Sequence, residues 1–69
     1  SVAIRMQRIG KKHEPVFRIV AMDKKRPRNG AYLELLGHFR PQFCDLPAEL
    51  RLDAALVRRY LANGAIPSD

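Results

Sequence analysis

The fold of this chain is decided by residues 2–22, which have the sequence VAIRMQRIGKKHEPVFRIVAM. Over residues 2–7 every second side chain is a large apolar one, and this period of two predicts a half-buried strand. On this pattern Arg5 and Gln7 lie on the solvent-exposed face. The chain is therefore expected to begin with an amphipathic β-strand.

A second strand is predicted after a short break. Gly10 and Pro15 predict a loop over residues 9–15, and residues 16–22 are apolar except for Arg18. This second strand should be more buried than the first. Because the connection is too short for a parallel crossover, we expect the two strands to pair antiparallel.

Further along, the chain predicts two more strands separated by loops. Residues 23–30, DKKRPRNG, lack periodic apolar side chains and end in a strong turn signal, so they predict a loop. Residues 32–39 have strand character, with Gly37 as a bulge or a point of close approach. An irregular loop is expected over residues 42–49, and residues 49–52 predict a short edge strand.

The last predicted element is a helix. Asp53 is a typical N-cap, an apolar stripe runs through residues 56–61, and Asn63-Gly64 is a stop signal. The predicted fold is α+β: a single domain over residues 1–69, with a small antiparallel sheet of about four strands, one packed helix and long basic loops. Ser68-Asp69 is a helix-starting pair, so we expect the natural chain to continue past Asp69.

A chain of 69 residues with one cysteine has few means of stabilising itself. A single core of this size rarely contributes more than a few kcal/mol, and one cysteine excludes an internal disulfide. A partner that binds only the folded state stabilises it by mass action. We therefore expect part of the order of this chain to come from a binding partner.

The charge is concentrated in the first part of the chain. The formal net charge is +6, but residues 1–28 hold nine Lys and Arg against two acids, whereas residues 29–69 hold four against five. A positive field built by one segment indicates a polyanionic partner. No apolar run approaches the roughly 18–20 residues that a spanning helix needs, so no membrane partner is expected.

The strongest local signal is the basic stretch at residues 24–28, KKRPR. Its four cations repel one another unless an anion lies among them. Pro27 stiffens the segment, and Asn29 and Gly30 allow the backbone to approach a phosphate closely. The alternative interpretation is a solvated turn that keeps the protein soluble.

A second basic turn, Lys11-Lys12, supports the interpretation as a binding surface. In the predicted hairpin the two basic segments lie at opposite ends of the second strand, about 20–25 Å apart, with Arg5 and Arg18 on the sheet. Such an arrangement would contact an extended duplex or a helical junction rather than one phosphate. Nucleic acid therefore fits better than a small anion.

Structured RNA fits this pattern better than DNA. A recognition helix for the DNA major groove would carry the basic side chains, whereas here they lie on predicted loops and strands. Structured RNA is read mostly by shape and phosphate contacts. The aromatic residues mostly alternate into a predicted core, with Tyr32 or Phe43 as the alternative stacking platform for a base.

No enzyme or metal pattern is recognisable in the sequence. His13, His38 and Cys44 lack ligand-like spacing, and there is no phosphate-binding glycine loop, serine elbow or paired carboxylate motif. We therefore expect no enzyme activity, cofactor, metal or small-molecule substrate, and place His13 beside phosphate. Asp23 could hold Mg²⁺ in a nuclease, or equally could hydrogen-bond the backbone of its own loop.

Several blocks of the sequence resemble, in the same order, the small-subunit ribosomal protein sixteen family of bacteria and organelles. They cover nearly the whole chain apart from residues 42–49, and they are residues 2–12, 15–20, 23, 28–30, 32–34, 36–41, 52–53, 60–61 and 64–69. Tyr60 stands where the family commonly has Trp. Arg40 stands where the family favours Asn or Asp, and Asn29 where Asp is common.

The resemblance implies a monomer within the ribosome that binds the 5′ domain of small-subunit ribosomal RNA early in assembly, beside neighbouring ribosomal proteins. It implies a ribosomal location in the bacterial cytoplasm or in an organelle, the mitochondrial matrix or the plastid stroma. It also implies phosphate contacts from Arg5, Arg8, Lys12, Arg18, Lys25 and Arg28, with Gly10, Gly30 and Gly37 serving turns and close approach. Together with the basic segments, the expected RNA-binding residues are Arg5, Arg8, Lys11, Lys12, His13, Arg18, Lys24, Lys25, Arg26, Arg28, Asn29 and Arg40.

The leading hypothesis is a structural constituent of the small ribosomal subunit. The alternatives are a free nucleic-acid-binding regulator or DNA-binding protein, and a metal-dependent nuclease centred on Asp23.

Overall fold

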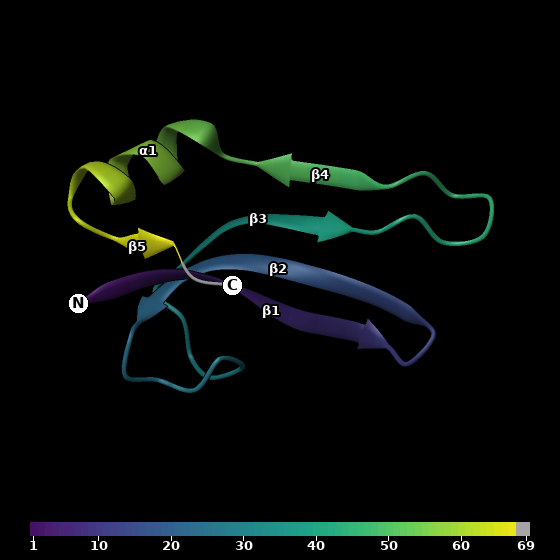
Figure 1. Ribbon diagram of the computed structural model, residues 1–69, viewed down its shortest axis with the longest axis horizontal. Coiled ribbons are helices and arrows are strands. Elements are labelled where there is room, and N and C mark those ends of the chain that lie inside the picture. The colour runs from purple at the N-terminus through teal and green to yellow at the C-terminus, as the bar shows by residue number, and fades with distance from the viewer. Residues whose placement is uncertain (68–69) are drawn as a thin grey trace.

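The sheet of this protein is built outward from one long hairpin. The computed structural model describes residues 1–67, and within them a curled five-stranded sheet has the order β4-β3-β2-β1-β5 (Figure 1). The elements are β1 Val2–Lys11, β2 Glu14–Asp23, β3 Glu34–Arg40, β4 Glu49–Leu52, α1 Ala54–Ala62 and β5 Ile66–Pro67. The fold is α+β, as predicted, with a mixed rather than wholly antiparallel sheet.

β1 and β2 pair antiparallel along their full length, which confirms the predicted hairpin. The expected loop over residues 9–15 is wrong, however, because the pairing continues to Lys11 opposite Glu14 and leaves only Lys12 and His13 in the turn. Gly10 makes this tight ending feasible. Its φ is +94°, and a Cβ there would lie 2.6 Å from the carbonyl oxygen of Glu14.

The fifth strand was missed by the sequence analysis. β5 pairs parallel with β1, with Ala3 opposite Ile66 and Ile4 opposite Pro67. Two residues are too few to show a period of two, so only the return of the chain after the helix reveals the strand. The predicted continuation past Asp69, and the signal at Ser68-Asp69, lie outside the described residues.

The faces of β1 are the reverse of those expected. Ala3 and Gln7 are buried, at 2% and 3% exposure, and share their face with the buried Val20 and Met22 of β2. Ile4 and Met6, on the other face, are only half-buried. The alternation was real, but the chain between β2 and β3 covers the face that looked polar, which overturns the prediction of a solvent-exposed Gln7.

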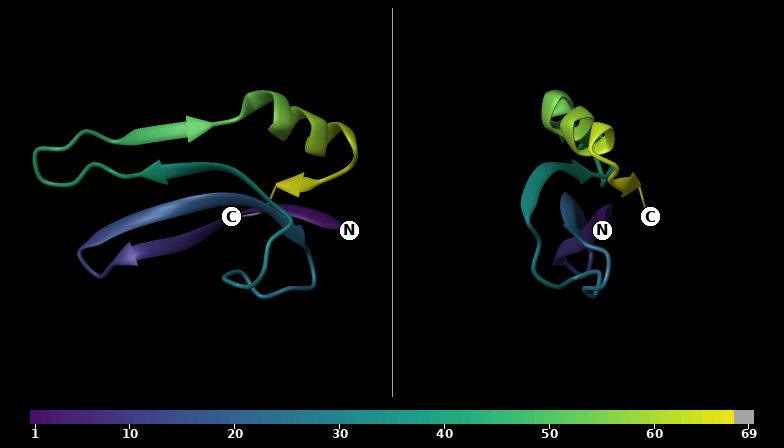
Figure 2. Two further views of the ribbon diagram at one scale, coloured as in Figure 1. Left: turned by 180° about the vertical axis from the view of Figure 1, so that it is seen from behind. Right: turned by 90° about the vertical axis from the view of Figure 1, so that its left-hand side faces the viewer.

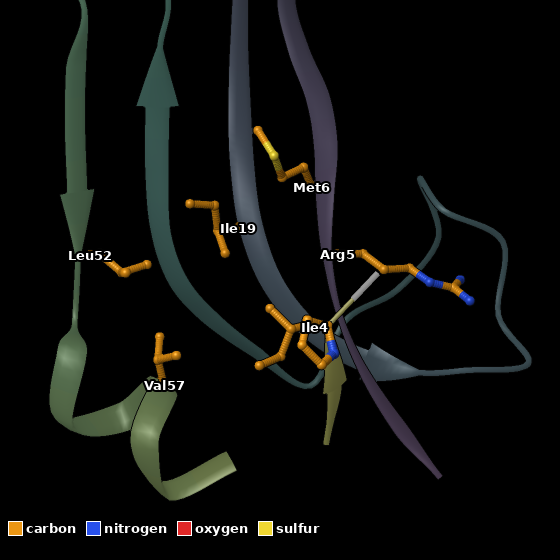
Figure 3. A pocket seen from close by; sticks show the side chains of 7 residues that line it. Ile4, Arg5, Met6, Ile19, Leu52 and Val57 are labelled. Carbon is orange, nitrogen blue, oxygen red and sulfur yellow. The ribbon is translucent and has the colours of Figure 1, made fainter. Parts of the chain in front are cut away.

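The opposite face forms an open apolar groove of about 560 Å³. Ile4, Met6 and Ile19 of the hairpin face Leu52 and Val57 across it (Figure 3). The Arg5 side chain leaves β1 away from the apolar members of this groove, toward the loop after β2 (Figure 3). The two faces of the sheet therefore have different chemistry, one apolar and open, the other occupied by a basic loop.

Gly37 is the predicted point of close approach. β3 pairs antiparallel with β4, which brings Gly37 opposite Leu52, and a Cβ on Gly37 would overlap the carbonyl oxygen of Arg51. On its other side the pairing with β2 changes register between Ile19 and Val20. β4 is the edge strand that was expected at residues 49–52.

The helix begins and ends as predicted, but it packs less than expected. The Asp53 side chain accepts a hydrogen bond from the Leu56 backbone N–H at 3.1 Å, and Asn63 is the C-cap of the helix. None of the nine residues of α1 is buried, and the Tyr60 hydroxyl anchors it by donating to Glu34 at 2.8 Å. α1 continues the line of β4 at one side of the sheet (Figure 2). Within residues 1–67 no helix has the length and apolar character needed to cross a membrane.

Candidate nucleic-acid interface

The loop between β2 and β3 carries the densest positive charge of the chain. Residues 24–29 are all exposed, and the loop hangs from one end of the sheet (Figure 1). Two successive turns shape it, because the Arg26 N–H donates to the Asp23 carbonyl at 3.0 Å and the Gly30 N–H donates to the Pro27 carbonyl at 2.8 Å. We call residues 24–30 the basic loop.

Two side chains of β1 fasten the basic loop to the sheet. The Arg5 guanidinium donates through Nη1 to the Arg26 carbonyl at 2.9 Å and through Nη2 to the Lys24 carbonyl at 3.1 Å. The buried Gln7 amide donates to the Gly30 carbonyl at 2.8 Å. Three backbone carbonyls of the loop are thus held by the strand beneath, which lowers the entropy that the loop loses when its cations meet a ligand.

A carboxylate makes the third attachment of the basic loop. Asp23, the last residue of β2, accepts a hydrogen bond from the Lys25 backbone N–H at 3.0 Å. This bond, followed by the positive charges of the N-terminal amine, Lys25 and Arg26, lowers the pKa of Asp23 below its ordinary value. Of the two roles considered for Asp23, the structure shows the hydrogen bond to its own loop.

The second basic segment sits at the far end of the hairpin. Lys11, Lys12 and His13, which we call the hairpin tip, are exposed. A long side-chain hydrogen bond reaches the hairpin tip, from Arg8 Nη2 to the Lys12 carbonyl at 3.5 Å. β2 has ten residues, so the two basic segments are separated by about 30 Å at 3.3 Å per residue, at opposite ends as predicted.

Between these ends, Arg18 lies over an aromatic ring. Its guanidinium carbon is 5.4 Å from the centroid of the Tyr32 ring, which is 37% exposed. A cation held over a ring in this way is attracted by the π-face. The Arg18 Nε is buried and has no hydrogen-bond partner among the described residues. Arg18 and Tyr32 therefore form a cationic, aromatic pair beside the basic loop.

Arg40 is not part of the basic loop cluster. Its Nη2 lies 3.6 Å from the Glu49 carboxylate and 3.4 Å from the Pro47 carbonyl. His38 and Arg51 contact the same carboxylate, at 3.7 and 3.0 Å. The hydrogen bond from Arg51, more than the other two groups, lowers the pKa of Glu49. Arg40 thus belongs to a charge cluster on β3 and β4 that is partly neutralised within the protein.

The described residues contain no group of three or more His, Cys, Asp or Glu side chains placed to hold a metal. Cys44 is exposed in the turn closed by Phe43 and Leu46. The rings of Phe17 and Phe39 stack with centroids 6.2 Å apart, and both residues are half-buried rather than enclosed in the core.

Comparison with known proteins agrees with the charge pattern. Residues 8–68 match the sequence model of the Ribosomal protein S16 family. The chain belongs to this family. A relative in Mycoplasma capricolum subsp. capricolum, named small ribosomal subunit protein bS16, is 47% identical over 68 residues. That alignment covers 99% of this chain and 59% of the relative, so the chain spans about three-fifths of the length of the curated relative.

In this S16 family member the residue that sequence analysis missed is Gln7. A glutamine in an alternating strand normally marks the wet face, and nothing in the sequence shows that a later loop will cover it. A second missed feature is a hollow of about 310 Å³ at the edge of β1, which combines strand and loop residues: Met6, Arg8, Phe17, Arg28 and Asn29. Their spacing in the chain gives no signal, since only the folded loop brings residues 28 and 29 to β1.

Proposed function

We propose that this protein is a structural component of the small ribosomal subunit that binds the 5′ domain of small-subunit ribosomal RNA during assembly. The observation that carries the proposal is the placement of two basic segments at opposite ends of one ten-residue strand, one of them fastened by Arg5 and Gln7. Membership of the S16 family, and a relative named as a small-subunit protein, support it.

The mechanism is electrostatic. Lys and Arg side chains replace the counterions of closely spaced phosphates, and the hairpin keeps the two groups of cations at a fixed separation. The proposed RNA contacts are Arg5, Arg8, Lys11, Lys12, His13, Arg18, Lys24, Lys25, Arg26, Arg28, Asn29 and Arg40. For Arg5 the proposal includes a second role, because its two terminal nitrogens hold the basic loop.

We further propose that the protein works as a monomer beside neighbouring small-subunit proteins, on a ribosome in the bacterial cytoplasm or in an organelle. This role needs no catalysis, cofactor, metal or small-molecule substrate. The bacterial relative supports a ribosomal location.

The salt dependence of binding tests the proposal. With about six to ten phosphate contacts, affinity for a 5′-domain RNA fragment should fall by roughly 10³–10⁵ between 50 and 200 mM salt. Filter binding would measure it, with generic duplex DNA of equal length as the control. A salt dependence that corresponds to only one or two phosphate contacts would reject the mechanism. Equal affinity for the RNA fragment and the DNA would favour a free nucleic-acid-binding regulator.

A further inference from the structure

The hollow of about 310 Å³ beside β1 joins two kinds of surface. Its floor is apolar, made by the half-buried Met6 and Phe17, and its rim carries the exposed Arg8, Arg28 and Asn29. Arg8 and Phe17 stand opposite each other in the β1–β2 register, so they lie on the same face of the hairpin. Two guanidinium groups and an amide thus border a floor with one aromatic ring and one thioether.

Packing and a hydrogen bond hold the walls of the hollow in place, and the free edge of β1 leaves it accessible to a ligand. The Phe17 ring is fixed by stacking on Phe39, with an interplanar angle of 27°. Among the described residues β1 has a strand neighbour on its outer edge only at Ala3 and Ile4, so no strand covers the edge at Met6 and Arg8. The loop wall is set by the Gln7 bond to Gly30, the residue that follows Asn29.

A nucleotide is the ligand that needs both surfaces at once. A base presents a flat π-face that stacks on an aromatic ring, and its phosphate is an anion for guanidinium groups. The bases of an intact duplex are stacked on each other, so only an unpaired nucleotide offers a free face. The volume lies at the lower end of the range for ligand sites, which suits one nucleotide.

We propose that this hollow binds a single unpaired nucleotide of the RNA, with its base on Phe17 and Met6 and its phosphate between Arg8 and Arg28. The Asn29 amide borders the base and offers both a donor and an acceptor to its edge. This inference rests on the proposed function and deepens it. It adds a position that recognises an unstacked base to a surface otherwise made of phosphate contacts.

Ultraviolet crosslinking of the protein to the 5′-domain RNA fragment, followed by mass spectrometry of the peptides, tests the inference directly. We expect a one-nucleotide adduct on Met6 or Phe17, from an unpaired RNA position. A hundredfold excess of mixed 5′-mononucleotides over the RNA should leave the adduct in place. Its loss under that competition would overturn the assignment to an RNA strand.

Matched variants separate stacking from stability. Phe17→Leu and Phe39→Leu each remove one ring of the same stacked pair, but only Phe17 lines the hollow. We expect Phe17→Leu to weaken RNA binding about tenfold, the usual loss of one base stack, and Phe39→Leu to weaken it clearly less, because the Phe17 ring stays in the hollow. Arg28→Gln, with Arg58→Gln on α1 as its control, keeps the test valid if Phe17→Leu does not fold, because both arginines are exposed.

The outcomes are distinguishable. Tight RNA binding with adducts only outside Met6 and Phe17, and equal effects of the two Phe variants, would overturn the nucleotide site and leave the proposed function standing. If the wild-type protein does not bind the 5′-domain RNA, the proposed function fails and this inference fails with it. An adduct in the hollow that Arg28→Gln reduces and Arg58→Gln does not would support the site.

Discussion

The basic loop and the hairpin tip carry the same kind of charge but are built differently. The basic loop has three backbone carbonyls held by Arg5 and Gln7 and one backbone N–H held by Asp23. The hairpin tip has one long contact from Arg8 and otherwise projects as the end of two paired strands.

The two basic segments therefore allow the effect of the number of charges to be compared with the effect of holding the charged backbone in place. A cation on a fastened backbone loses less conformational freedom on meeting a phosphate than one on a free tip. The basic loop should therefore contribute more affinity per cation, and the hairpin tip should contribute mainly to long-range attraction.

The largest expected effect comes from releasing the loop at Gln7. Gln7 is only 3% exposed, and Gln7→Leu removes the side-chain amide that donates to the Gly30 carbonyl. Losing one partner of such a bond costs about 1–3 kcal/mol of unfolding free energy. Urea unfolding measures this loss, and limited trypsin digestion should show faster cleavage after Lys24 and Lys25 with no change after Lys11 and Lys12.

The control for this variant is Gln42→Leu, because Gln42 is exposed between β3 and β4. It should leave both the unfolding free energy and the digestion pattern unchanged. If Gln7→Leu accelerates cleavage equally at both basic segments, the variant has loosened the whole hairpin and the basic loop is not separately fastened.

Much of this fold was predictable because local patterns dominate it. The hairpin, the Asp53 cap, the edge strand at residues 49–52 and the close approach at Gly37 each depend on a few neighbouring residues. What failed was non-local. Which face of β1 is buried depends on a loop some twenty residues later, since Gln7 bonds to Gly30.

The same reasoning applies to the interface. Its cations were visible in the sequence, because they stand together as KKRPR and Lys11-Lys12. The hydrogen bonds that organise them were not, and neither was the hollow where residues 28 and 29 meet β1. The mixed sheet was missed for a related reason: β5 is two residues long and is defined by its partner.

A pair of double variants compares the two basic segments in RNA binding. Lys24→Gln with Lys25→Gln should flatten the salt dependence by about two phosphate contacts, roughly one for each lysine. The change in affinity between 50 and 200 mM salt would then shrink roughly tenfold. Lys11→Gln with Lys12→Gln removes the same charge from the hairpin tip and should lower the affinity less at any one salt concentration. Equal losses of affinity in filter binding would show that fastening the loop does not matter for affinity.

The smallest expected effect comes from protonating the Asp23 carboxylate, which should weaken its hydrogen bond to the basic loop. Its pKa is lowered chiefly by the bond from the Lys25 N–H, so its contribution to loop order is present above the ordinary pKa of an aspartate and is lost as the pH falls through the lowered value. The Lys25 amide resonance should therefore shift as the pH falls from about 5 toward 2, with a midpoint below the ordinary aspartate value.

Asp23→Asn keeps an oxygen acceptor but cannot titrate, so its Lys25 amide should lose this transition. A transition that persists in Asp23→Asn, or a wild-type midpoint at the ordinary value, would show that the carboxylate does not fasten the loop and that the hydrogen bonds from Arg5 and Gln7 fasten it instead.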